Sequence, residues 1–166
     1  MPSSSAGKRL ATQRSAGILL FRRTGGEVEF LLVHPGGPFW ARKDAGAWSI
    51  PKGGIENEEE PRACAIRELE EELGPAPDLD PAQLVELGSI RQKAGKVVEA
   101  WAAEADFDPA TLASNTFEME WPPRSGSRQE FPEVDRAEWF DLEAAREKIL
   151  PAQAEFLDRL LERLDV

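Results

Sequence analysis

Three glutamates with helical spacing are the residues of this chain best placed to do chemistry. Glu71 and Glu72 follow Glu68 by three and four positions, which on a helix brings the three side chains onto one face. Each such like-charge pair destabilises an isolated helix by about 0.2–0.5 kcal/mol. A hard divalent cation such as Mg²⁺ or Mn²⁺ prefers oxygen ligands, so a carboxylate cluster on a helix can hold one. The cluster therefore indicates either metal-assisted attack on a phosphate ester or anhydride, or an acidic helix face in contact with solvent.

Negative charge is concentrated around these glutamates. The 17 residues from Glu56 to Glu72 contain eight glutamates and two arginines, which gives a net charge of −6. The whole chain has 20 lysines and arginines against 31 aspartates and glutamates, a net charge of −11 at pH 7. Nonspecific binding to a phosphate backbone depends on basic surfaces, so we expect no nucleic-acid partner.

The acidic segment is predicted to contain a helix over residues 61–73. Pro61 suits the first helical position, because the backbone N–H that proline lacks would have no partner there. The Gly74–Pro75 pair supplies a stop at the other end. At 100° per residue, three apolar side chains fall within about 60° of one another and predict a stripe that faces the core. This stripe consists of Ile66, Leu69 and Leu73.

Apolar runs on either side of this helix predict strands, separated by segments rich in Gly and Pro. The expected strands are a hairpin of 16–22 and 28–33, a short strand at 48–50, a second hairpin of 84–91 and 97–105, and strands at 117–121 and 139–140. Residues 152–164 predict a C-terminal amphipathic helix, since leucines and a phenylalanine recur there at helical spacing. Strands clustered around few helices predict an α/β (α+β) domain.

The residues around the glutamates form a longer pattern, which resembles the signature of the Nudix hydrolase family. The matching positions are Gly53, Glu59, Arg67-Glu68-Leu69, Glu71-Glu72 and Gly74. Eight constrained positions over 22 residues make this a specific match, and the predicted loop followed by a helix is the context that the family uses. The chain departs from the family at Pro75, where an aliphatic residue is usual, and we expect this to alter only the helix exit.

The resemblance implies a fold, a reaction and roles for these residues. The fold would be an α/β/α sandwich with a mixed sheet, and the reaction Mg²⁺- or Mn²⁺-dependent hydrolysis of a nucleoside diphosphate linked to another moiety. The metal ligands implied are Glu68, Glu71 and Glu72, with the backbone carbonyl of Gly53 and, as an outer ligand or water holder, Glu59. Arg67 would orient a carboxylate by bidentate hydrogen bonding, which a guanidinium does well. Catalytic roles thus fall to Glu71 and Arg67.

A further carboxylate often lies, in this family, six residues ahead of a Trp on the loop before the final strand. Counting back from Trp139 selects Glu133 as an additional ligand or general base. A base must lie within hydrogen-bond reach of the attacking water, so several other glutamates stay open as rivals. These rivals are Glu104, Glu118, Glu120 and Glu130.

Other residues have weaker claims to contact a substrate. Four cations could bind phosphate, although surface solubility explains each of them about as well. They are Arg42, Lys43, Lys52 and Arg91. Four tryptophans could stack on a nucleobase, although a place in the core or at its rim is the commoner role. They are Trp40, Trp48, Trp101 and Trp121. His34, the single histidine, is expected near a strand end.

Length and composition predict one domain over 15–166 that follows a flexible tail over 1–14. No apolar run has the roughly 20 residues that a bilayer requires, and one cysteine allows no internal disulfide, so we expect a cytoplasmic setting without membrane insertion. The expected partner is a small nucleotide substrate. Nucleoside triphosphates, dinucleoside polyphosphates, ADP-ribose-like compounds and nucleotide sugars stay open, as does the oligomeric state. The alternatives are a catalytically silent nucleotide-binding regulator on the same fold and a structural acidic interaction domain.

Overall fold

The apolar run near the N-terminus forms the central strand of the protein, β1 (Arg14–Thr24). The computed structural model describes residues 13–75 and 77–165. Side chains of β1 alternate between two hydrophobic clusters, one on each face of the sheet, and are almost fully buried on both. They are Ala16, Ile18 and Leu20 on one face and Leu19 and Phe21 on the other. Burial on both faces explains why residues 16–21 of this strand are apolar in succession instead of alternating with polar residues.

The main sheet has six strands in the order β4-β5-β1-β2-β8, and β3 pairs with β1. Its other strands are β2 (Glu27–Pro35), β3 (Lys52–Gly54), β4 (Val85–Arg91), β5 (Val97–Glu104) and β8 (Val134–Phe140). β1 and β5 run parallel, whereas every other pair is antiparallel, so the sheet is mixed as expected. Both predicted hairpins, β1–β2 and β4–β5, are confirmed.

β1 pairs with two strands in succession. Residues Ser15–Gly17 pair with β3, and residues Phe21–Thr24 pair with β2. Gly17 allows the first of these contacts, because a Cβ atom there would lie 2.4 Å from the carbonyl oxygen of Pro51. The arrangement brings β3, the start of the predicted signature, against the middle of the fold.

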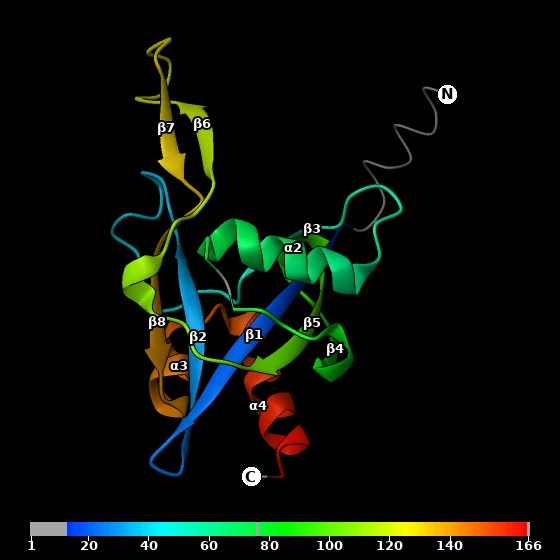
Figure 1. Ribbon diagram of the computed structural model, residues 1–166. Coiled ribbons are helices and arrows are strands. Elements are labelled where there is room, and N and C mark those ends of the chain that lie inside the picture. Colours follow the sequence, from blue (N-terminus) through cyan, green and yellow to red (C-terminus); the bar gives the residue numbers. More distant parts are fainter. Residues whose placement is uncertain (1–12, 76, 166) are drawn as a thin grey trace.

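Helices cover both faces of this sheet, which gives the predicted α/β/α sandwich (Figure 1). On one face, α2 (Pro61–Leu73) buries the side chains of Cys64, Ala65, Leu69 and Leu73. On the other face, α3 (Leu142–Lys148) and α4 (Ala154–Arg163) pack on the sheet. Pro61 and Gly74 bound α2 as predicted, and Gly74 has the positive φ of 82° that a glycine stop supplies.

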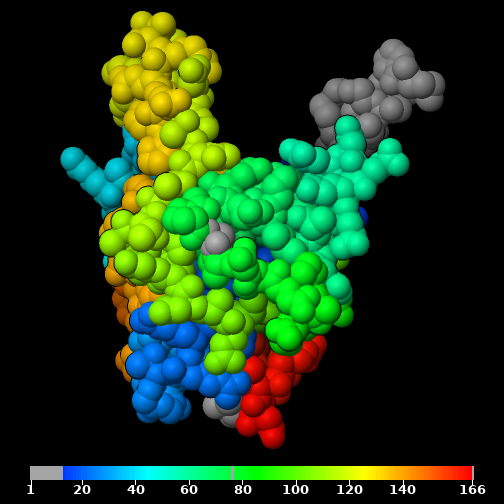
Figure 2. All heavy atoms as spheres, in the orientation of Figure 1, coloured from blue at the N-terminus to red at the C-terminus, as the bar shows by residue number. Residues whose placement is uncertain are grey.

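A second sheet of two strands, β6 (Thr116–Glu120) and β7 (Arg128–Pro132), is formed by one hairpin. This hairpin projects from one end of the molecule (Figures 1 and 2). Phe117 and Phe131 stack across its two strands with ring centroids 6.0 Å apart. The predicted strand at 117–121 is thus confirmed, but it belongs to this hairpin and not to the main sheet.

The structure corrects several predicted boundaries. The last strand of the main sheet is β8, with seven residues instead of the two expected, because its alternating charged residues hide an edge strand. The C-terminal helix begins at Ala154, after a single 3₁₀ turn over Pro151–Gln153. α3 and β7 were not predicted, although Asp141 is an N-cap signal for α3, since it accepts a hydrogen bond from the N–H of Ala144.

The last residue of the predicted N-terminal tail, Arg14, is the first residue of β1 and pairs with Val97 of β5. The N–H of Val97 also donates to the carbonyl of Gln13. Residues 1–12 lie outside the described part of the chain. Within residues 13–75 and 77–165, no helix is both long and apolar enough to cross a membrane.

Candidate active site

Arg67, on α2, joins three of the signature carboxylates. Its Nε and Nη2 atoms donate to the two carboxylate oxygens of Glu59 at 2.8 and 2.9 Å, which is the bidentate geometry expected of a guanidinium. Its Nη1 atom donates to Oε2 of Glu68 and to Oε2 of Glu71, each at 2.8 Å. A further bond of 3.2 Å to the carbonyl oxygen of Gly54 ties the side chain to β3. One side chain therefore fixes the loop, the helix face and the strand relative to one another.

Gly53, in β3, is needed because the carboxyl group of Glu68 lies where a side chain would be. A Cβ atom on Gly53 would lie 2.0 Å from both Cδ and Oε1 of Glu68. Real Cβ atoms essentially never show such a contact, so any side chain at position 53 would force the carboxyl group of Glu68 out of its place. The Gly53 position therefore lets a helix carboxylate approach the backbone of the strand directly.

Burial raises the pKa of two glutamates on α2. Burial raises the pKa of Glu72 to about 8, although the neighbouring Lys52 ammonium opposes this shift. Burial also raises the pKa of Glu68, and the charge of Glu71 adds to the rise. Glu59 differs, because its hydrogen bonds from Arg67 lower its pKa to about 2. The cluster thus combines one carboxylate whose ionised form is stabilised by Arg67 with two carboxyl groups whose burial disfavours the ionised form.

Glu133, the residue selected by counting back from Trp139, lies beside the glutamates of α2. Burial raises its pKa, and the nearby charge of Glu71 raises it further. A run of backbone hydrogen bonds places it there: the N–H of Asn115 donates to the carbonyl of Glu71, and the N–H of Glu133 donates to the carbonyl of Asn115. The N–H of Gly36 then donates to the carbonyl of Glu133 at 2.9 Å. This run ties the end of α2 to the turn before β8.

The four rival carboxylates lie elsewhere. Glu118, Glu120 and Glu130 are exposed on the β6–β7 hairpin, and Glu120 accepts hydrogen bonds within that hairpin from Arg124 and Gly126. Glu104 is exposed at the end of β5, where it pairs with Arg23. Among these candidates, the structure therefore brings only Glu133 to the cluster on α2.

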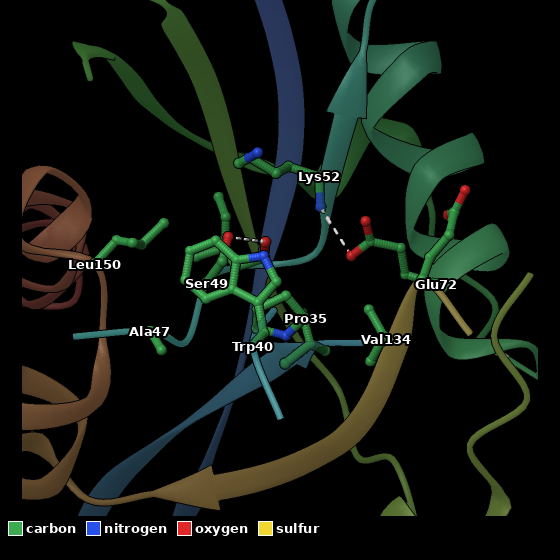
Figure 3. Close-up of a pocket in the computed structure, with 11 residues that line it drawn as sticks. Pro35, Trp40, Ala47, Ser49, Lys52, Glu72, Val134 and Leu150 are labelled. Atoms are coloured by element: carbon green, nitrogen blue, oxygen red, sulfur yellow. Dashed lines mark hydrogen bonds between the residues drawn. The ribbon is translucent and has the colours of Figure 1, made fainter. Parts of the chain in front are cut away.

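A pocket of about 200 Å³ opens beside the cluster (Figure 3). Its lining combines apolar side chains with the polar groups of Ser49, Lys52, Glu72 and Glu133. The apolar part consists of Val33, Pro35, Trp40, Ala47, Ile50, Val134 and Leu150. In Figure 3 the N–H of Lys52 points to Glu72, at 3.3 Å, on the side of the pocket where α2 lies. The pocket is thus apolar on one side and charged where it meets the glutamates.

A comparison with protein-family models agrees with this geometry. The model described as NUDIX domain matches residues 11–160. The protein belongs to the NUDIX domain family. The Nudix signature residues are therefore those of Gly53 to Gly74, and the family fold is the sandwich described above.

Curated Nudix relatives match this chain over short segments. The RNA pyrophosphohydrolase of Alkalilimnicola ehrlichii is 51% identical over 52 residues, which are 30% of this chain and 29% of that protein. Nudix hydrolase 25 of Arabidopsis thaliana is 59% identical over 29 residues, which are 18% of this chain and 17% of that protein. The matched segments thus span less than a third of these relatives.

Solved Nudix structures match over most of the chain but at low identity. A binary complex of the C. elegans Ap4A hydrolase has a TM-score of 0.60 and 24% identity, and the match covers 91% of this chain and 98% of that one. The NUDIX domain of NrtR from Shewanella oneidensis, complexed with ADP ribose, has a TM-score of 0.62 and 18% identity, with 93% and 89% coverage. At these identities the likeness shows a shared fold.

The Nudix pocket includes one of the four cations that the sequence singled out. Lys52 lines it, and burial lowers the pKa of Lys52 while Glu72 opposes that shift. Arg42 and Lys43 are exposed on the loop that carries Trp40, and the Lys43 ammonium lies 5.1 Å from the centre of the Trp40 ring. Arg91 lies at the end of β4, outside the pocket lining, where it donates to the carbonyl of Gly95.

The four tryptophans named above occupy different environments in the structure. Trp48 and Trp101 are buried in the two hydrophobic clusters, so each has the core role. Trp121 packs edge-on against Phe39, 5.3 Å away, beside the projecting hairpin. Trp40 lines the pocket and is 37% exposed. Sequence reasoning did not find the rest of the apolar lining, because it comes from separate segments whose residues look like ordinary core.

Proposed function

We propose that this Nudix protein is a divalent-cation-dependent hydrolase that cleaves a phosphoric anhydride in a nucleoside diphosphate derivative. The observation that carries the proposal is the arrangement around Arg67, which holds Glu59, Glu68 and Glu71 next to a pocket with an apolar side and a lysine. An apolar pocket with few polar groups suits a nucleobase, and a cation at its edge suits a phosphate. The relatives named as RNA pyrophosphohydrolases and as an Ap4A hydrolase support this reaction class.

The donor atoms around Gly53 fit a hard divalent cation. Carboxylate and carbonyl oxygens are the ligands that Mg²⁺ and Mn²⁺ prefer, and the buried Glu72 carboxyl needs positive charge nearby to ionise. Within the described residues no three acidic, histidine or cysteine side chains already converge in metal-binding geometry. Arg67 bonds to one carboxylate oxygen each of Glu68 and Glu71, so we propose that Glu68, Glu71 and Glu72, together with the Gly53 carbonyl, would hold the cation. Glu59 then acts through Arg67 or as an outer ligand.

Different side chains would have different roles in the reaction. A bound divalent cation would polarise the anhydride and neutralise charge that develops on its phosphate oxygens. Glu133 would accept a proton from the attacking water, since its raised pKa brings a carboxylate closer to the range of a useful base. Lys52 would contact a phosphate, and Trp40 would stack on the base.

A panel of nucleotides tests the proposed function. We expect Mg²⁺-dependent release of phosphate, pyrophosphate or a nucleoside monophosphate from at least one of a nucleoside triphosphate, Ap4A, ADP-ribose, a nucleotide sugar and 5′-triphosphorylated RNA. Glu71→Gln is the inactive control. The lack of any tyrosine removes a residue that dinucleoside-polyphosphate members of the family often carry, and the acidic chain disfavours long RNA. Binding without turnover would instead favour the silent regulator, and neither binding nor turnover the acidic interaction domain.

Mg²⁺ is expected to stabilise the folded protein. A ligand that binds only the folded state at ten times its Kd adds about 1.4 kcal/mol, which is about 3–5 °C in Tm for a domain of this size. Thermal unfolding at increasing Mg²⁺ should show this rise, and Glu72→Gln should weaken it. Glu70→Gln is the matched control, since Glu70 lies on the same helix but is exposed. A Tm that does not change with Mg²⁺ in the parent protein would exclude the metal site.

Replacing Arg67 with lysine should lower turnover by about 10- to 100-fold with the fold intact. Lysine retains the charge but cannot donate to both oxygens of Glu59 and also reach Glu68 and Glu71. Arg62→Lys, on the exposed part of the same helix, is the control for a general loss of helix stability. If Arg67→Lys has the turnover of the parent, Arg67 is only a surface ion-pair partner.

A further inference from the structure

His34, the single histidine of the chain, is buried in β2 with both of its ring nitrogens engaged. Nδ1 lies 2.8 Å from Oδ1 of Asp135, in β8. Nε2 lies 2.6 Å from the backbone carbonyl oxygen of Lys43, in the loop between β2 and β3. The ring also packs edge-on against Trp48, with centroids 5.2 Å apart. His34 thus bridges the last strand of the main sheet and a loop beside the pocket.

The partners of His34 require it to donate from both nitrogens. A backbone carbonyl can only accept, so Nε2 must carry a proton. An ionised Asp135 can also only accept, so Nδ1 must carry a proton as well for both bonds to be made, and a ring that makes both bonds is an imidazolium. Arg136 Nε lies 3.7 Å from the same carboxylate oxygen of Asp135. The charged groups that surround the ring are Asp135 and Arg136 from β8, Lys43 and Asp44 from the loop, and Lys148 from α3, which pairs with Asp44.

The loop residue that His34 contacts, Lys43, is bonded in turn to Trp40, which lines the pocket. The N–H of Lys43 donates to the carbonyl of Trp40 at 2.9 Å, so the residue that His34 holds also closes the turn that carries Trp40. The next residue is held as well, because the indole N–H of Trp48 donates to Asp44 at 2.8 Å. Two buried side chains thus fix consecutive residues of the loop, and Trp40 lines the pocket from it (Figure 3).

We propose that His34 is a positioning residue that, as an imidazolium, holds the loop 36–46 and its Trp40 side chain against the pocket, and that the loop is released when His34 loses a proton. Only the identity of the ligand that Trp40 contacts rests on the proposed function. The charged ring uses one N–H for Asp135 and the other for Lys43, and a neutral ring has one N–H for two acceptors.

The direction of the pH effect follows from the two acceptors. A carboxylate is a stronger acceptor than a peptide carbonyl, so the neutral ring keeps its proton on Nδ1, toward Asp135. The lone pair of Nε2 then faces the Lys43 carbonyl, where it repels the oxygen instead of binding it. The loop is therefore held while both ring nitrogens carry a proton, and it is released when Nε2 loses its proton.

Asp135→Asn separates the charge of His34 from its position. An asparagine amide can donate to Nδ1, which leaves a neutral ring free to carry its proton on Nε2 and to donate to Lys43. We expect this variant to hold the loop at every pH. His34→Gln should lose the link at every pH, because it cannot span both partners in the same geometry.

Nitrogen NMR and amide hydrogen exchange test the proposal without any substrate, so their result does not depend on the hydrolysis panel. One histidine gives one pair of imidazole nitrogen signals. As the pH is raised, we expect loss of the Nε2 proton to coincide with a fall of about tenfold in the protection factors of residues 37–46, after correction for intrinsic exchange. Protection in β1 should stay constant. In Asp135→Asn we expect a neutral ring protonated on Nε2 and loop protection that does not vary with pH.

Two results would overturn the proposal. The first is a neutral imidazole in the parent protein while the loop stays fully protected. The second is loop protection that is unchanged in His34→Gln, or that follows pH in Asp135→Asn as it does in the parent.

Discussion

Glu133→Gln is expected to lower kcat by about 100-fold or more, since a positioned general base contributes about 10²- to 10⁴-fold. Glutamine has nearly the same shape and leaves the backbone bonds to Asn115 and Gly36 in place, but it cannot accept a proton from water. The rise in Tm with Mg²⁺ should be largely retained, because the proposed ligands, the glutamates of α2 and the Gly53 carbonyl, would still hold a cation. The measurements are kcat for the best substrate of the panel and the Tm series in Mg²⁺.

Glu130→Gln is the matched control for this variant. Glu130 lies three residues earlier and is exposed on β7, so its loss should change neither kcat nor the response to Mg²⁺. If Glu133→Gln leaves kcat unchanged, the general base lies elsewhere. A large loss of kcat in Glu118→Gln, Glu120→Gln or Glu130→Gln would then place the base on the projecting hairpin. A loss of Mg²⁺ stabilisation in Glu133→Gln would make Glu133 a necessary ligand instead of a base.

Gly53→Ala should reduce turnover by about 100-fold or more, the effect expected when a reacting group is misplaced by about 1 Å. The added methyl group would lie 2.0 Å from the Glu68 carboxyl group, which must therefore move out of its place against β3. Glu68 also accepts a hydrogen bond from Arg67, so its displacement disturbs the bonds to the other carboxylates. We expect a weaker rise in Tm with Mg²⁺ as well.

Gly54→Ala provides the comparison, because the two glycines are adjacent in β3. A Cβ atom on Gly54 would have no neighbouring heavy atom of the described chain within 4 Å. Both variants make the same chemical change in the same strand, so the general effect of alanine on β3 is shared. If Gly53→Ala turns over substrate like Gly54→Ala, the carboxylate of Glu68 does not need its observed position.

Local chemistry made part of this protein predictable from its sequence. The bounds of α2 followed from Pro61 and Gly74, whose backbone preferences act within one turn of the helix. The two hairpins followed from apolar runs around short turns. The signature spacing placed its arginine and glutamates on one helix, where neighbours three and four positions apart must meet. Elements with weak periodicity were missed or predicted too short, as the unpredicted α3 and the charged edge strand β8 show.

Only the tertiary structure determined what surrounds that helix. Glu133 lies 62 positions after Glu71 in the sequence, and it reaches the cluster because backbone bonds through Asn115 tie the end of α2 to the turn before β8. The pocket and the bridge from His34 to Asp135 and Lys43 likewise join segments that are distant in the chain. Such contacts depend on how whole elements pack, and no periodicity or turn signal encodes them. The sequence by itself therefore determined the family, the fold class and the signature helix, whereas packing decided which distant residues lie beside that helix in the candidate site.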